Sequence, residues 1–240
     1  MKSCIKVIGT SSSGNCLAIY DSRGKYIVLD CGIKYSSIIK GLDYDLQNCV
    51  AVFVTHIHND HALSINEFIN RGVRVFANDE VADTYKRCER IKTALAFDED
   101  GFRVRTFNVE HNAKNNAFIV NTIDGIRVLY VTDAKQIPYT VKDVNYAVIE
   151  CNYSDDDIID NMVDGQDPKS QYYNHLSFEK CQDYLKRIYN KDLNGIILWH
   201  PSSTNIDIEK AKKNIRETLG FDDVYVGRKN LEIEIKKTAF

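Results

Sequence analysis

Four residues of the kinds that bind metal ions lie within six positions of one another. They follow the apolar stretch 50–54 and are His56, His58, Asp60 and His61. Such a stretch is typical of a buried strand, so we expect these residues on the loop at its carboxyl end. In extended backbone His56 and His58 project to the same side and can bind one ion, whereas Asp60 and His61 follow a turn and can face a second. A lone pair of turn histidines would be weak evidence, but four such residues together predict a two-metal site.

Three further candidate ligands follow other apolar strands. His111 comes directly after 107–110 and can complete a three-histidine set with the first pair. Asp133 ends the strand 128–133, and its two carboxylate oxygens can bridge two cations. His200 ends the strand 196–200 and can complete the second set. The alternative roles are a surface histidine for His111, a helix N-cap for Asp133 and a structural histidine for His200.

Three more residues have roles outside the two ligand sets. Asp30 closes the apolar stretch 26–30 and is expected to orient the histidine loop as a hydrogen-bond acceptor. Glu150 and His175 have no coordination position left, so they can form a carboxylate–histidine pair that protonates a leaving oxygen. The alternatives are a salt bridge for Glu150 and a helix-start position for His175. Asp60, Glu150 and His175 are the candidate catalytic residues.

Short apolar runs separated by turns predict the elements that carry these residues. We expect strands over 5–9, 16–20, 26–30, 51–55, 73–77, 102–109, 116–122, 127–132, 146–149 and 195–199, with two more near 224 and 231–235. We expect helices over 33–40, 61–70, 79–90, 178–189 and 208–219. This order predicts an α/β protein with an αββα sandwich, in which two mixed sheets carry helices on their outer faces.

The acidic segment 154–174 contains Asp155, Asp156 and Asp157 and has no clear periodicity. It is our candidate for an irregular, mobile loop at the active site.

Length and composition restrict the class of protein. The chain has 240 residues, of which 44% are hydrophobic, and no linker-like segment divides it, so we expect one domain over 1–240. No stretch approaches the roughly 20 apolar residues of a membrane span, and the N-terminus does not resemble a signal peptide. Seven cysteines without a C-x-x-C pair indicate reduced thiols in a cytoplasmic protein.

Charge gives a weaker restriction on the substrate. The formal net charge is −3 and the basic residues are scattered along the chain. A long polyanionic substrate is therefore not favoured by charge, although a basic patch can still assemble from residues distant in sequence.

The order of these motifs resembles the metallo-β-lactamase fold superfamily over nearly the whole chain. Within it, the segments 11–16, 150–152, 175–177 and 200–202 look like the YycJ-like and RNase Z-like phosphodiesterase branch. The resemblance implies that one ion is held by the first three histidines and the other by Asp60, His61 and His200, with Asp133 as the bridge. Attack by a hydroxide between the ions is the implied reaction, with zinc as the first choice of metal and manganese as a second.

The resemblance also limits the possible classes of substrate. RNase Z enzymes carry a long basic arm that clamps tRNA, and nothing of that kind is inserted here. A compact member of this branch resembles the phage anti-Pycsar phosphodiesterases, homodimers that open cyclic mononucleotides such as cCMP and cUMP. In such an arrangement Tyr172 and Tyr173 would stack on the base, and Ser202 would be a further substrate-binding residue. In a phage protein, the site of action would be the host cytoplasm.

Other functions stay open at this stage. The runner-up is a YycJ-like nuclease acting on DNA or RNA. Superfamily relatives also cleave thioesters and lactones with the same histidine box, but Glu150 and His175 argue against that chemistry. A protein that binds a nucleotide without cleaving it would usually lack one or more of these ligands.

Overall fold

The computed structural model describes residues 2–92, 94–163 and 169–237. The strands are β1 (Cys4–Gly9), β2 (Cys16–Tyr20), β3 (Tyr26–Leu29), β4 (Cys49–Val54), β5 (Val75–Ala77), β6 (Glu89–Arg90), β7 (Leu95–Glu99), β8 (Phe102–Val109), β9 (Asn115–Asn121), β10 (Arg127–Val131), β11 (Tyr146–Glu150), β12 (Gly195–Trp199), β13 (Val224–Val226) and β14 (Glu232–Glu234). The helices are α1 (Tyr35–Gly41), α2 (Asn59–Ala62), α3 (Ile65–Ile69), α4 (Asp79–Thr84), α5 (Asp155–Val163), α6 (Lys169–Asn174), α7 (Phe178–Ile188) and α8 (Ile208–Leu219).

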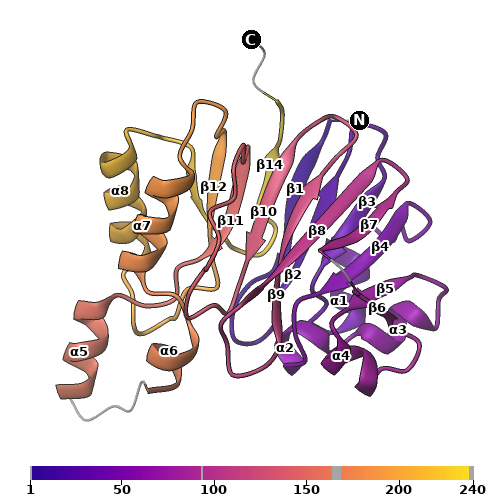
Figure 1. Cartoon of the computed structure of the whole chain (residues 1–240), viewed down its shortest axis with the longest axis horizontal. Helices are drawn as coiled ribbons and strands as arrows, with labels where there is room; N and C mark the ends of the chain where they lie inside the picture. Colours follow the sequence, from indigo (N-terminus) through magenta and orange to yellow (C-terminus); the bar gives the residue numbers. More distant parts are fainter. Residues whose placement is uncertain (1, 93, 164–168, 238–240) are drawn as a thin grey trace.

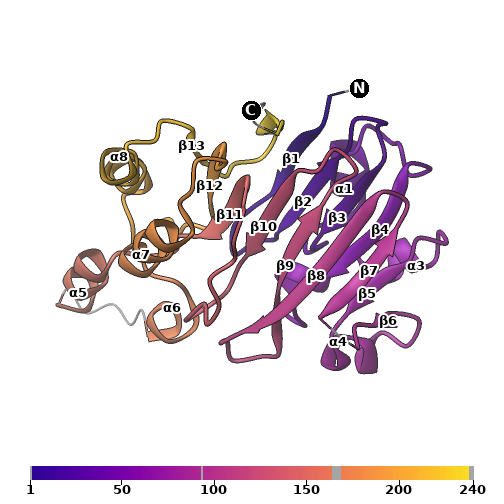
Figure 2. The ribbon, with the colours of Figure 1, turned by 45° about the horizontal axis from the view of Figure 1, so that its top comes forward.

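The strands form two mixed sheets of seven. The first has the order β14-β1-β2-β3-β4-β5-β6 and the second β13-β12-β11-β10-β9-β8-β7. In the first sheet β3 to β6 run parallel, and in the second β10 to β13 do. Helices lie on the outer faces, with α7 and α8 beyond the second sheet and α1 and α3 beyond the first (Figures 1 and 2). The αββα sandwich predicted from the sequence is confirmed.

Three apolar clusters hold these layers together. The largest lies between the sheets and brings Phe53 of β4 against Phe118 of β9, with Trp199 in the same cluster. A second packs α7 and α8 on the second sheet, and a third packs α1 and α3 on the first. Strands such as β4, β11 and β12 are covered on both faces, which is why their sequences are continuous apolar runs rather than alternating patterns.

The acidic segment is helical where the structure describes it, so the prediction of an irregular loop over 154–174 was wrong. It contains α5 and α6, while 164–168 fall outside the described residues. The Ser154 hydroxyl accepts a hydrogen bond from the Asp157 amide at 3.1 Å, as a helix N-cap does. Carboxylates in the first turn of α5 also favour its positive end. These two local signals outweigh the weak periodicity of the segment.

Two other expected helices differ from the observed elements. The helix expected over 79–90 ends at Thr84, and the chain then turns so that Glu89 pairs with Phe76 as the short edge strand β6. The helix expected over 61–70 is divided into α2 and α3. Strand β7 was not predicted, because its short apolar run ends in two acidic residues and only one of its five residues is buried.

Candidate metal centre

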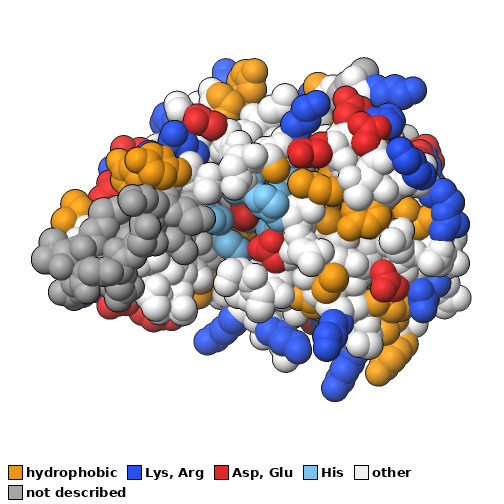
Figure 3. Space-filling model, turned by 90° about the horizontal axis from the view of Figure 1, so that it is seen from below, with side chains coloured by type: hydrophobic (Ala, Val, Ile, Leu, Met, Phe, Trp, Pro, Cys, Tyr) orange, Lys and Arg blue, Asp and Glu red, His pale blue; other side chains and the backbone are white. Residues whose placement is uncertain are grey.

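Six ligand-bearing segments end at one edge of the sandwich, beside α2 and α6 in Figure 1. Three overlapping groups of side chains there could hold a metal ion. They are His56, His58, His111 and Asp133; Asp60, His61, Asp133 and His200; and Asp133, Glu150, His175 and His200. Figure 3 shows the histidines gathered with acidic side chains in a hollow of this face. The structure thus brings together all seven predicted ligands and both residues of the predicted proton-transfer pair.

The first cluster has the geometry of a metal-binding site. His58 Nδ1 lies 3.0 Å from His56 Nε2 and 3.2 Å from His111 Nε2. Two nitrogen ligands of a tetrahedral zinc ion stand about 3.3 Å apart, since each bond is roughly 2.0–2.1 Å. The second ring nitrogens of His56 and His111 have other partners, because His56 Nδ1 lies 3.0 Å from the Thr55 hydroxyl and His111 Nδ1 lies 2.9 Å from the Asn174 carbonyl. The three converging nitrogens therefore fit one ion.

The second cluster shares Asp133 with the first. His61 Nε2 lies 3.5 Å from carboxylate oxygens of both Asp60 and Asp133. His200 Nε2 lies 3.8 Å from Asp60, is buried and has no hydrogen-bond partner among the described residues. A buried ring nitrogen without a partner is costly, and a metal ion at this position would satisfy it.

The shifted pKa values of His56 and Asp133 favour metal binding. Burial, followed by the neighbouring His61, lowers the pKa of His56 well below its usual value, so its ring is neutral and can act as a ligand. Burial alone would raise the pKa of Asp133, but His200 and His61 lower it well below its usual range. A carboxylate is therefore present between the two histidine sets at neutral pH.

Three of the site residues have an unusual backbone conformation. Asp30, Asp133 and His200 have φ angles of 57°, 51° and 51°, in the left-handed region. Each lies one or two residues beyond the end of its strand, where this conformation turns the chain sharply away from the sheet. Non-glycine residues adopt it at an energetic cost, and such conformations concentrate at functional sites.

Asp30 organises the histidine loop, as the position of this residue after a strand predicted. One carboxylate oxygen lies 2.8 Å from His61 Nδ1 and accepts a hydrogen bond from the Tyr130 hydroxyl, also at 2.8 Å. The other accepts from the Thr55 amide at 2.8 Å and from the Thr55 hydroxyl at 2.9 Å. Asp30 thereby leaves His61 Nε2 directed at the cluster.

Substitution of Asp30 by asparagine should weaken metal binding. We expect the affinity of the cluster that contains His61 to fall about 10–100-fold, because an amide has only one oxygen for the donors of Thr55 on one side and of His61 and Tyr130 on the other. Competition with a chromophoric chelator would measure this. Asp43→Asn is the matched control, since Asp43 has a φ of 54° and an exposed side chain. Equal affinities in the two variants would contradict the orienting role.

Sequence reasoning missed several supporting residues. Asn15 donates its backbone N–H to the Asp60 carbonyl at 2.7 Å, and its Nδ2 lies 3.1 Å from His61 Nε2. Asn152 donates to the His200 carbonyl at 2.8 Å. Both lie in segments that carried the family resemblance, and that was the only available signal.

Glu150 and His175 form a close pair beside the clusters. His175 Nδ1 lies 2.6 Å from Glu150 Oε1, and Glu150 Oε2 accepts hydrogen bonds from the Ala134 and Leu176 amides at 2.8 and 3.0 Å. Burial alone would lower the pKa of His175, but Glu150 raises it to about 9. The ring of His175 is stacked on that of His200, with centroids 5.3 Å apart. A protonated histidine therefore lies against the metal centre at neutral pH.

The three proposed substrate-binding residues lie in different environments. Tyr172 and Tyr173 belong to α6 and are 45% and 57% exposed, with ring centroids 5.3 Å apart. Ser202 Oγ accepts hydrogen bonds from the Thr204 and Asn205 amides, so it stabilises its own turn. Substrate binding by these three residues stays a prediction.

The comparison with family models decides the relationship of this chain to known proteins. The model of the metallo-beta-lactamase superfamily matches residues 9–136, the part that contains the histidine box, His111 and Asp133. The chain belongs to the metallo-beta-lactamase superfamily. Members of this superfamily are generally metal-dependent hydrolases, which agrees with the clusters described above. No curated protein matches the sequence.

Solved structures show the same fold along the whole chain. The metallo-beta-lactamase fold protein YhfI from Bacillus subtilis has a TM-score of 0.77 at 15% identity, covering 98% of this chain and 100% of its own. A diphosphatase of the PhnP family has a TM-score of 0.72 at 12% identity, covering 98% of each chain. The short form of human tRNase Z has a TM-score of 0.65 at 15% identity, covering 97% of this chain and 99% of its own.

All seven cysteines are free thiols. Within the described ranges, no helix is both long and apolar enough to cross a bilayer.

Proposed function

We propose that the protein is a phosphodiesterase that uses two divalent metal ions, with zinc as the preferred metal and manganese as the alternative. The observation that carries the proposal is the shared carboxylate of Asp133 between two ligand clusters, with the Glu150–His175 pair directly beside them. Two ions held by these ligand sets would favour attack on a phosphoryl centre. A protonated histidine beside them favours departure of an alkoxide.

The geometry supports the assignment of the ligands to two ions. His56, His58 and His111 would hold one ion, and Asp60, His61 and His200 the other. When bound, the ions would lower the pKa of water and stabilise charge on the phosphoryl oxygens, an effect of several kcal/mol.

His175 is the proposed proton donor. A water-derived oxygen forms a bond to phosphorus as the bond to the leaving oxygen breaks, and the leaving oxygen takes the bonding electrons and a proton from the imidazolium. Glu150 stabilises the imidazolium and holds its orientation, while two backbone amides fix the carboxylate. Water later returns the proton.

Cyclic mononucleotides, opened in an anti-Pycsar role, are the proposed substrates. Tyr172 and Tyr173 support this proposal because two exposed rings near His175 could stack on a base. Lys135 Nζ lies 6.0 Å from the Tyr173 ring and adds a cation there. The same proposal includes a homodimer, in which α6 of one subunit contributes to the site of the other. It also includes action in the cytoplasm.

A YycJ-like nuclease acting on DNA or RNA is the second candidate, and one surface favours it. A cavity of about 730 Å³ is lined by Leu176, next to His175, and by Lys180, Lys186 and Arg187 of α7. Such cations can follow a nucleic-acid backbone. The fold of human tRNase Z is also similar to that of this chain.

The substrate can be tested directly with metal-loaded protein. We would incubate it with cCMP, cUMP, cAMP, cGMP, and short single-stranded DNA and RNA, and analyse the products, with His58→Ala as the inactive control. Opening of cyclic nucleotides alone would support the first candidate, and cleavage of oligomers alone the second. Hydrolysis of acyl thioesters without any cleavage of phosphodiesters would refute both.

The raised pKa of His175 predicts a basic limb in the pH profile of kcat, that is, a fall of kcat at high pH. The imidazolium is the proton donor, and its fraction falls as the pH rises through about 9. We therefore expect kcat for a substrate with an alkoxide leaving group to decline above that pH. His175→Ala should lower this kcat about 100-fold or more and remove the limb. Glu150→Gln should move the limb to lower pH, because the charge that raises the pKa is lost.

The leaving group provides the control for this prediction. Nitrophenolate departs without a proton, so hydrolysis of bis-p-nitrophenyl phosphate should be much less affected by His175→Ala. Equal losses on both substrates would show that His175 positions the site rather than donating the proton.

A further inference from the structure

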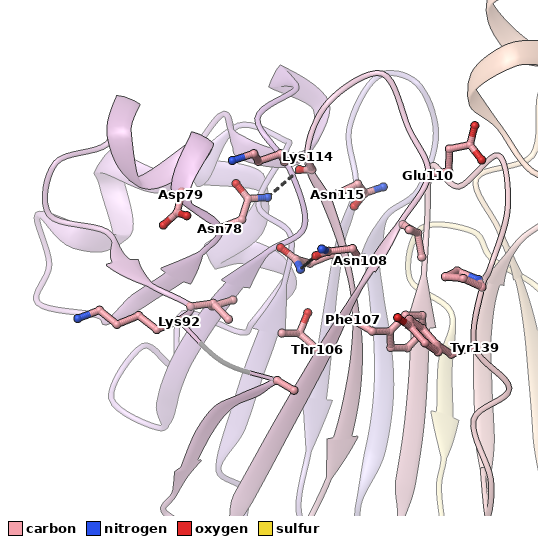
Figure 4. A pocket seen from close by; sticks show the side chains of 15 residues that line it. Asn78, Asp79, Lys92, Thr106, Phe107, Asn108, Glu110, Lys114, Asn115 and Tyr139 are labelled. Atoms are coloured by element: carbon pink, nitrogen blue, oxygen red, sulfur yellow. Dashed lines mark hydrogen bonds between the residues drawn. The ribbon is translucent and has the colours of Figure 1, made fainter.

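A cavity of about 970 Å³ lies outside the three ligand clusters (Figure 4). Asn78 and Lys92 line it on the side of the first sheet, and residues 106–109 of β8 line it on the other. Glu110, Lys114 and Asn115 also line it, so the segment that carries His111 runs along its border. Among the described residues that line it, none belongs to the clusters. A cavity of this size can hold a ligand as large as a nucleotide.

One wall of the cavity is aromatic. Phe107 of β8 and Tyr139 meet with their ring planes at 82° and their centroids 5.7 Å apart. Tyr139 is 60% exposed, so much of its ring surface is available to a planar ligand. Stacking on such a ring is favourable for any nucleobase, since each base has a π-face.

Paired asparagines beside this wall offer a donor and an acceptor. Asn116 Nδ2 donates to Asn108 Oδ1 at 3.0 Å, which leaves the amide hydrogens of the exposed Asn108 side chain available. Asn116 Oδ1 is buried and has no hydrogen-bond partner within the described structure. A small movement of the Asn116 side chain would let a ligand donor reach this oxygen. Asparagine amides pair well with base edges that carry both a donor and an acceptor.

Two lysines line the same cavity. Lys92 and Lys114 are exposed, and the described residues form no ion pair with either. Three nearby carboxylates have other partners: Asp79 pairs with Arg90, Glu110 pairs with Lys135, and Glu80 accepts a hydrogen bond from the backbone N–H of Lys114 at 2.9 Å. Both ammonium groups can therefore contact an anionic group of a ligand, such as a phosphate.

The floor of the cavity is bonded to the strand ends that hold the ligand clusters. Asn78 Nδ2 donates to the Thr55 carbonyl, directly before His56, at 3.1 Å. Asn115 Nδ2 donates to the Thr132 and Asp133 carbonyls at 2.9 and 2.7 Å. A ligand in the cavity would thus rest on residues that position both clusters.

We propose that this cavity is a second ligand site and binds a nucleoside monophosphate. The base stacks on Tyr139 and bonds to Asn108 and Asn116, while the phosphate lies at Lys92 and Lys114. The site is distinct from the metal centre and does not depend on the proposed hydrolytic function.

Calorimetry with metal-loaded protein and AMP or CMP tests the proposal. Neither probe is a phosphodiester, so neither would be consumed by the proposed activity. We expect saturable binding in the wild-type protein, normal binding in His58→Ala, and a Kd about tenfold higher or more in Tyr139→Ala. Tyr139→Phe should retain binding, because it keeps the ring. Tyr44→Ala is the matched control, since Tyr44 is 71% exposed and lies elsewhere.

Two results would overturn the second site. In one, His58→Ala loses nucleotide binding while Tyr139→Ala keeps it, which would place the nucleotide at the metal centre. In the other, AMP binds no more tightly than inorganic phosphate, or does not bind at millimolar concentration. Thermal unfolding of each variant would show that a changed Kd does not reflect a misfolded protein.

Discussion

Asp133→Asn is expected to abolish nearly all hydrolysis of bis-p-nitrophenyl phosphate, with a loss of at least about 1000-fold. The two ligand clusters share this carboxylate, and its Oδ2 atom lies 3.8 Å from His56 Nε2 and 3.5 Å from His61 Nε2. An amide oxygen carries no negative charge, so it is a much weaker bridge between two cations than a carboxylate oxygen. We expect the bound metal, measured by mass spectrometry, to fall from about two ions per chain to one or fewer.

Asp143→Asn is the matched control for this variant. Asp143 also has a left-handed backbone, with a φ of 57°, but its side chain is 84% exposed. Asparagine tolerates this conformation, so both variants should fold. Wild-type metal content and activity in Asp133→Asn would exclude the bridging role.

Gly32→Ala is expected to destabilise the protein by about 3 kcal/mol or more and to disrupt metal binding. A Cβ atom at Gly32 would lie 1.6 Å from the Asp60 carbonyl oxygen and 2.3 Å from the His61 backbone nitrogen. These neighbours are backbone atoms that cannot rotate away. Next to Gly32, the Cys31 N–H donates a hydrogen bond to the His61 carbonyl at 2.8 Å. Relief of the clash would therefore displace the whole segment that carries Asp60 and His61.

Gly72→Ala separates this steric effect from backbone strain. Gly72 has a φ of 80°, but a Cβ there would meet no atom within 4 Å. We expect this control to lose about 1–2 kcal/mol and to keep its metal content. Urea unfolding and metal analysis of both variants would test the prediction. A Gly32→Ala variant as stable and as well metallated as Gly72→Ala would show that the backbone contact is unimportant.

Helical signals in the second half of the chain show where local reasoning succeeded and failed. The helix beginning at Phe178 was predicted because Ser177 is an evident N-cap and the apolar spacing that follows is regular. In contrast, α5 and α6 were missed, although Ser154 caps α5 in the same manner. The difference is that α5 and α6 have weaker apolar periodicity, and only tertiary contacts such as the hydrogen bond from His111 to the Asn174 carbonyl fix the end of α6.

The sequence by itself determined the fold class and the candidate ligands. Apolar strands that end in His111, Asp133 and His200 can be recognised locally, and strands of the same direction must end at the same edge of a sheet. The supporting role of Asp30 was also predicted, but tertiary structure alone decided which residues hold this carboxylate in place. Asp30 and Tyr130 are 100 positions apart, yet they share a buried hydrogen bond of 2.8 Å. No periodicity encodes such a pair, because it arises only when two sheets pack and a buried polar group must find a partner.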